Sequence, residues 1–154
     1  MNSGEALVGN IGSQRRFNYT VMSDAVNLAS RLEGANKFFG TSIMASETTV
    51  GLTGEAFAWR ELDEIRVKGR SQPVKIYELL DQAGQLTAER KAVAAAYAEG
   101  LASWRQRDFA TAVQCFERAA AIDPPSARFL PRAKALALAP PGPDWDSVCT
   151  LEEK

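Results

Sequence analysis

The stretch "VGNIGSQRRFNYTVMSDAVNLASRLE", residues 8–33, decides the fold class of this chain. Its first part holds two apolar-polar segments on either side of the turn residues 12–15, a pattern that is typical of a β-hairpin. From Ser23 onward the apolar residues recur at helical spacing, and Ser23 or Asp24 is placed to cap the first free N–H groups of a helix. The stretch therefore predicts two antiparallel strands followed by a helix that ends near Gly40.

The glycines of this stretch, Gly9 and Gly12, raise the question of phosphate binding. A P-loop needs a longer glycine loop that closes with Lys-Ser or Lys-Thr at the start of a helix. Here Gly12 is followed by Ser-Gln-Arg-Arg and a second strand, and the dinucleotide pattern G-x-G-x-x-G is absent from the sequence. We interpret these glycines as turn residues of the hairpin.

The predicted helix carries two polar residues on an otherwise apolar surface. Its apolar residues wrap most of the circumference, so we expect the helix to be largely buried. Asn27 and Arg31 lie four positions apart and therefore share one narrow stripe. A buried arginine needs an anionic partner, because leaving its charge unpaired costs several kcal/mol. Two kinds of partner fit: a carboxylate of the protein, such as Glu33 or Glu61, and a ligand phosphate.

The rest of the chain changes from a mixed pattern to an alanine-rich helical one. Residues 41–46, 58–69 and 72–80 read as strands, with a short helix at 47–52. After a break, helical spacing recurs at 88–105, 109–122 and 126–138, with Pro124 and Pro125 stopping the second of these helices. We therefore divide the chain into residues 1–82, a helical segment at 83–140 and an extended tail at 141–154.

The first two helices of the helical segment resemble one tetratricopeptide repeat. The residues at the expected offsets are Gly100, Phe109, Ala112, Phe116, Ala119 and Pro124. A single repeat cannot form an independent solenoid, because each repeat buries its face on a neighbour. The alternative is a generic helical hairpin.

The composition excludes several classes of chemistry. The 154 residues include no histidine, which rules out a Ser-His-Asp triad, a histidine base and a histidine-ligated metal. The net charge is −1 without a long charged block, which argues against nucleic-acid binding. Cys115 and Cys149 have no metal-ligand spacing, and Cys115 is predicted to be a buried thiol in a reducing cytoplasm. No apolar run approaches the ~20 residues of a membrane span.

Residues 4–33, "GEALVGNIGSQRRFNYTVMSDAVNLASRLE", resemble the second half of the catalytic domain of class III adenylate and guanylate cyclases. They match the pattern G-E-x-x-x-G-N-I-G-S, then Y-T-V, then D-x-V-N-x-A-x-R-L-E. The likeness continues through residues 67–79, "VKGRSQPVKIYEL", and so covers about residues 1–80. It implies an α+β fold: the C-terminal half of a ferredoxin-like (βαββαβ) cyclase domain, followed here by an α-helical hairpin tail. The final residues, 143–154, are similar to tails of many bacterial members.

The resemblance also implies roles for four residues. Asn27 would orient the ribose, and Arg31 would stabilise charge that develops on the α-phosphorus as the 3′-hydroxyl attacks. Lys68 would reach the β- and γ-phosphates; its alternative is a solvated hairpin lysine. Thr20 occupies a purine-reading position, and its hydroxyl can accept from adenine or donate to guanine, so it does not settle the base. The resemblance implies ATP as the expected substrate, with GTP as the alternative. A β-branched strand residue explains Thr20 equally well.

In the family, two Mg²⁺ or Mn²⁺ ions are held by two aspartates from the first half of the domain. The opening residues "MNSGE" offer nothing equivalent, so no metal ligand is predicted here. We expect a part of an adenylate cyclase that makes cyclic AMP and pyrophosphate, is inactive alone, and pairs with another cyclase domain or a second copy of itself. The alternative is a non-catalytic, cyclase-like module for dimerisation or protein interaction through the helical tail.

Overall fold

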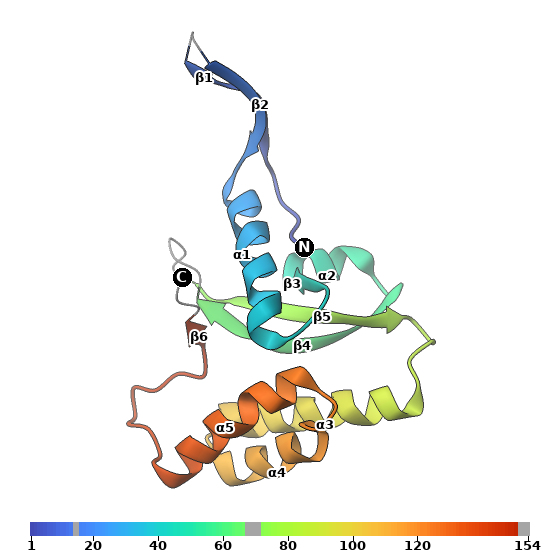
Figure 1. Ribbon diagram of the computed structural model, residues 1–154, viewed down its shortest axis with the longest axis vertical. Coiled ribbons are helices and arrows are strands. Elements are labelled where there is room, and N and C mark those ends of the chain that lie inside the picture. Colours follow the sequence, from blue (N-terminus) through green and yellow to red (C-terminus); the bar gives the residue numbers. More distant parts are fainter. Residues whose placement is uncertain (14–15, 67–71, 151–154) are drawn as a thin grey trace.

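The computed structural model describes residues 1–13, 16–66 and 72–150, and in this part of the chain the fold is mixed α+β. Figure 1 shows a β-hairpin that projects from a body, in which a sheet lies between α1 and α2 on one side and three helices on the other. The elements are β1 (Leu7–Ser13), β2 (Arg16–Met22), α1 (Asp24–Phe39), β3 (Met44–Ser46), α2 (Glu47–Thr53), β4 (Phe57–Arg66), β5 (Val74–Gln82), α3 (Ala88–Arg105), α4 (Phe109–Ala119), α5 (Pro124–Leu138) and β6 (Cys149–Thr150).

The projecting hairpin consists of β1 and β2, paired antiparallel as the sequence predicted. Its register places Gly9 opposite Thr20. Among the side chains of this hairpin that the structure describes, five large apolar ones are exposed: Leu7, Val8, Tyr19, Val21 and Met22. The hairpin therefore presents apolar surface away from the body.

Helix α1 begins and ends at the predicted residues. The Ser23 hydroxyl accepts a hydrogen bond from the Val26 N–H at 3.2 Å, and Gly40 ends the helix in the left-handed region with φ 71°. The expectation that α1 is largely buried is wrong. Only one stripe is buried, formed by Leu28, Leu32, Ala35 and Phe39, because the helix packs on β3, β2 and α5 by a single face.

The larger sheet has the strand order β3-β5-β4-β6. The first two pairings are antiparallel, and the short strand β6, which lies in the tail that we expected to be extended, runs parallel to β4. A bulge in β4 leaves Leu62 between the pairs Glu61–Tyr77 and Asp63–Ile76. As a result, the adjacent residues Leu62 and Asp63 are both fully buried, which simple alternation along a strand does not predict.

Helices α3, α4 and α5 form a layer, called the helical layer below, under the sheet (Figure 1). Each begins with a capping side chain: Thr87, Asp108 and Asp123. Gly100 lets α3 approach α4, because a Cβ at this position would lie 2.7 Å from the Phe116 ring. The prediction that Pro124 and Pro125 precede the third helix is wrong. They form its first turn, where a missing N–H costs nothing.

One aromatic cluster joins the helical layer to α1. Phe129 of α5 lies at its centre, with ring centroids 5.2 Å from Phe116, 5.4 Å from Trp104, 5.8 Å from Tyr97 and 6.3 Å from Phe39 of α1. The core is therefore continuous across residue 82. Cys115 is buried and free, as predicted. None of the helices in the described part of the chain has the length and apolar character to cross a bilayer.

Candidate functional site

Three of the four predicted site residues fall within the described structure. Asn27 lies in the first turns of α1 and is exposed, and Arg31 follows four residues later and is half-buried. Thr20 is exposed on β2, the strand that leads into α1. Lys68 lies outside the described residues. The spacing of Asn27 and Arg31 thus places both on a face of α1 that solvent can reach, whereas we expected them to be enclosed.

The start of α1 is held by the N-terminal segment, which the sequence did not identify as part of a site. The Asn2 side-chain amide donates to the Ala25 carbonyl at 2.9 Å, and its Oδ1 accepts from the Ser46 hydroxyl at 2.5 Å. Gly4 packs closely here as well, since a Cβ on it would lie 2.8 Å from Ala25 Cβ. Asn2 therefore links the first turn of α1 to the end of β3.

A cavity of about 680 Å³ opens beside this segment. Its charged lining residues are Glu5, Asp24, Glu47, Glu64 and Lys75. Lys75 Nζ lies 3.9 Å from Glu47 Oε1, so this amine faces a carboxylate already. The excess of carboxylates disfavours a triphosphate in this cavity by charge repulsion. Neither Asn27 nor Arg31 is among the residues that line it.

The two protein carboxylates considered for Arg31 differ in their surroundings. Glu61 Oε1 accepts from Arg105 Nη2 of α3 at 2.6 Å, so Glu61 is engaged with the helical layer. Glu33 is exposed on α1 itself. Glu61 is therefore the weaker of the two candidates.

A metal centre finds no support in the described residues. Over residues 1–13, 16–66 and 72–150, no three histidine, cysteine, aspartate or glutamate side chains come together in a way that could hold an ion. The Mg²⁺ or Mn²⁺ implied by the resemblance therefore does not fit the donors of this part of the chain, and we assign no step to a metal held by it.

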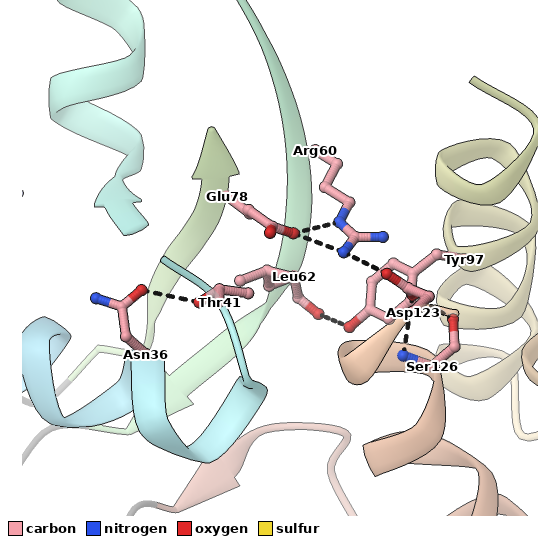
Figure 2. Close-up of polar contacts among 8 residues, drawn as sticks. All are labelled: Asn36, Thr41, Arg60, Leu62, Glu78, Tyr97, Asp123 and Ser126. Atoms are coloured by element: carbon pink, nitrogen blue, oxygen red, sulfur yellow. Dashed lines mark hydrogen bonds and ion pairs between the residues drawn. The ribbon is translucent and has the colours of Figure 1, made fainter. Parts of the chain in front are cut away.

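Within the described residues, a set of enclosed polar contacts joins the sheet to the helical layer, at a place the sequence did not indicate. Figure 2 shows Arg60 of β4 between Glu78 of β5 and Asp123, with Nε 2.6 Å from Glu78 Oε2 and Nη2 2.7 Å from Asp123 Oδ1. Asp123 Oδ2 also accepts from the Ser126 N–H and hydroxyl, which caps α5. Burial raises the pKa of Glu78, and the charge of Arg60 partly offsets this effect.

A second contact satisfies the backbone at the bulge. The Tyr97 hydroxyl donates to the Leu62 carbonyl at 2.6 Å (Figure 2). The sequence shows no distinctive signal for this interface, because β4 carries other charged residues beside Arg60, among them Glu61 and Glu64. The partner of Arg60, Asp123, lies 63 positions away in the chain, beyond the reach of local patterns.

Residues 1–81, more than half of the chain, match the family described as the adenylate and guanylate cyclase catalytic domain. This chain belongs to that family. The class III cyclase resemblance of the sequence is thereby confirmed for this region, while a tetratricopeptide-like character of the helical layer stays a prediction.

Curated relatives agree with this assignment. Adenylate cyclase 1 of Rhizobium meliloti is 44% identical over 80 residues, which are 52% of this chain and 12% of that protein. The terminal-differentiation specific adenylate cyclase of Dictyostelium discoideum is 37% identical over 84 residues, 53% of this chain and 4% of the relative. The adenylate cyclase of Anabaena cylindrica is 37% identical over 82 residues, which are 51% of this chain and 16% of that protein. The chain thus spans a small fraction of each relative.

One similar solved structure is that of the adenylyl cyclase CyaB from P. aeruginosa. It is 38% identical, the match covers 53% of this chain and 41% of that one, and the TM-score is 0.44.

Proposed function

We propose that this chain contributes the C-terminal part of a class III adenylate cyclase site, which converts ATP to cyclic AMP and pyrophosphate when a second cyclase domain or half-domain completes it. The observation that carries the proposal is the Asn-Arg pair. It lies within the region that matches the cyclase family, on a face of α1 that a ligand or partner can reach. The substrate follows from three relatives that are named adenylate cyclases.

In this proposal each residue has a distinct role. Asn27 orients the ribose by hydrogen bonding, and Arg31 holds charge on the α-phosphate, for which a guanidinium is well suited. Thr20 contacts the purine from β2, and Lys68 binds the outer phosphates. A threonine hydroxyl serves adenine and guanine alike, so GTP stays the alternative substrate.

The proposed partner is another cyclase domain, supplied by a second copy or by a different chain. It would cover the apolar surface of the hairpin and bring the carboxylates for Mg²⁺ or Mn²⁺. Exposed apolar patches of this kind commonly mark protein interfaces. On its own, the chain is proposed to be inactive.

The alternative is a non-catalytic, cyclase-like module that binds a partner through the helical layer. One observation favours it: the close approach of Gly100 to Phe116 is suited to tetratricopeptide-like packing. The two functions differ in whether Arg31 acts on a substrate.

A fusion experiment tests the proposed site. The first half of a related cyclase is fused ahead of Met1, and Asn27→Ala, Arg31→Ala and the control Ser30→Ala, an exposed residue of the same helix, are compared. Arg31→Ala should lower kcat by ~10²–10³ with little change in KM, because the interaction is made in the transition state. Ser30→Ala should leave kcat unchanged. A destabilised Arg31→Ala variant whose folded fraction turns over normally would contradict the proposal and assign Arg31 a structural role.

A further inference from the structure

We propose that Asp63 is a protonation-controlled contact between the sheet and the helical layer, closed while its carboxyl group is neutral and loosened when that group ionises. This contact is separate from the Asn-Arg pair. It rests on the surroundings of Asp63 in β4, on the helices packed over it and on the unsatisfied polar atoms at this interface.

The carboxyl group of Asp63 is enclosed, and in the described structure no side chain donates a hydrogen bond to it. Its side chain is 0% exposed, because the bulge at Leu62 turns both residues inward. Among the described residues, neither Asp63 Oδ1 nor Oδ2 has a hydrogen-bond partner. An ionised carboxylate in such a place loses its hydration, and the Glu64 backbone and the charges of Arg132 and Arg105 compensate for this loss only in part, whereas the neutral acid is tolerated.

The charged and titratable groups that face Asp63 come from four elements. They are Arg105 and Tyr97 of α3, Arg132 of α5, Cys149 of β6 and the neighbouring Glu64 of β4. Burial raises the pKa of Asp63 to about 7, while the backbone of Glu64 and the charges of Arg132 and Arg105 act in the opposite direction.

The groups that could neutralise Asp63 already have other contacts. Arg105 binds Glu61 at 2.6 Å, and the Arg132 guanidinium lies 5.1 Å and 5.0 Å from the ring centroids of Trp104 and Phe129. The single Tyr97 O–H is donated to the Leu62 carbonyl. Arg105 Nε and Arg132 Nη1 are nevertheless buried without hydrogen-bond partners in the described structure, so each guanidinium retains one unpaired donor.

Ionisation of Asp63 therefore favours a rearrangement of the interface. Water must enter, or the side chain of Arg105 or Arg132 must shift to bring its unpaired donor to the carboxylate, and either change alters the packing of α3 or α5 on β4. Helix α5 also touches α1 through the pair Phe129–Phe39. Loosening of α5 from β4 would thus also affect the packing of α1, the helix that carries Arg31. An effect on the cyclase site rests on the proposed function, whereas the protonation of Asp63 does not.

The direction of the pH effect follows from the pKa of Asp63. The folded value of about 7 lies above the ordinary value of 3.8, so between these limits the folded state binds more protons than the unfolded state. The contribution of neutral Asp63 to the free energy of unfolding is fully present below pH 3.8 and is lost as the pH rises through the folded pKa of about 7. From pH 5 to pH 8 this effect increases the unfolding constant by about 10²-fold.

The test is urea unfolding of the whole chain at pH 5 and pH 8, with Asp63→Asn, Asp63→Leu and the control Asp146→Asn. Asp146 is a suitable control because it is 54% exposed and binds Arg66. The chain has no histidine. The pKa of the Met1 ammonium is lowered by partial burial and that of the Glu78 carboxyl is raised by burial, but both groups are present in every variant, so comparison between variants cancels their contributions. Both Asp63 variants should lose the ~10²-fold pH effect, while Asp146→Asn should keep it.

Hydrogen exchange and NMR complete the test. In the wild type, amides of α3 and α5 should exchange faster at pH 8 than at pH 5 after correction for the intrinsic rate, and Asp63→Leu should abolish this difference. Titration of the Asp63 carboxyl carbon by NMR in the wild type needs no variant and should give a midpoint near 7. An Asp63 that titrates below pH 5, or Asp63 variants that keep the wild-type pH dependence, would overturn the proposal.

Discussion

Gly40, the residue that ends α1, lies directly against Pro124, the first residue of α5. A Cβ placed on Gly40 would come within 2.6 Å of Pro124 Cβ, closer than two carbon atoms can approach. Gly40 also has φ 71°, a conformation that favours glycine. Position 40 therefore requires glycine for two independent reasons: its left-handed backbone conformation and the lack of space for a side chain beside Pro124.

Gly40→Ala is accordingly expected to destabilise the fold by more than about 1 kcal/mol, since the left-handed conformation alone costs ~1–2 kcal/mol and the contact with Pro124 adds to it. The matched control is Gly34→Ala in the same helix, where an added Cβ meets nothing within 4 Å. Gly34→Ala should stabilise by roughly 0.5–1 kcal/mol. Urea unfolding measures both, and equal effects of the two substitutions would refute the proposed packing of α1 on α5.

Arg60→Met is expected to cost about 3–5 kcal/mol, because it leaves the carboxylates of Glu78 and Asp123 buried without their common partner. The control is Arg66→Met, which breaks an ion pair whose side chains are 44% and 54% exposed. That loss should stay within about 1 kcal/mol. Thermal unfolding of the two variants would separate the enclosed contact from the exposed one, and a small effect of Arg60→Met would show that the interface does not depend on it.

Tyr97→Phe removes one hydroxyl and leaves the ring in place. The Leu62 carbonyl at the bulge then loses its donor, so we expect a destabilisation of about 1–3 kcal/mol. Tyr19→Phe on the 76% exposed hairpin residue should have almost no effect. A comparison of urea midpoints decides this, and a neutral Tyr97→Phe would mean that the carbonyl finds another donor.

The predictable features of the fold were those set by neighbouring residues. Local backbone chemistry predicted Ser23 or Asp24 as the N-cap of α1 and an end near Gly40, and the structure has Ser23 as the N-cap and Gly40 at the end. The spacing of Asn27 and Arg31 correctly placed them on one side of α1. Burial of that side was predicted wrongly, because the periodicity of a helix shows which faces differ and not what covers them.

The features that the sequence did not reveal depend on distant residues. The bulge at Leu62 shifts the alternation of β4 by one residue, so a simple strand pattern does not predict that the adjacent residues Leu62 and Asp63 are both buried. The contact between Arg60 and Asp123 joins positions 63 residues apart. Strand β6 has only two residues and forms through its pairing with β4, without a signal of its own.

The exposed hairpin leads to a prediction about association. At high concentration the chain should form a dimer or larger species, because Leu7, Val8 and Tyr19 are exposed together with their apolar neighbours. Leu7→Lys should shift the mass measured by light scattering toward the monomer. Leu52→Lys, at a 74% exposed residue of α2 outside the hairpin, is the control. A wild type that stays monomeric, or an equal effect of both substitutions, would contradict this use of the hairpin.

The last prediction concerns catalysis by the chain alone. Purified protein incubated with ATP or GTP and Mg²⁺ or Mn²⁺ should make no measurable cyclic nucleotide, because the described residues bring no carboxylate set together for metal ions. Activity should appear when a cyclase domain that carries metal ligands but lacks its own Asn-Arg pair is added. That complemented activity should depend on Arg31 and be lost with Arg31→Ala, while Ser30→Ala should retain it. If the isolated chain turned over substrate and Arg31→Ala abolished this activity, the result would instead show that this chain holds its own metal ligands.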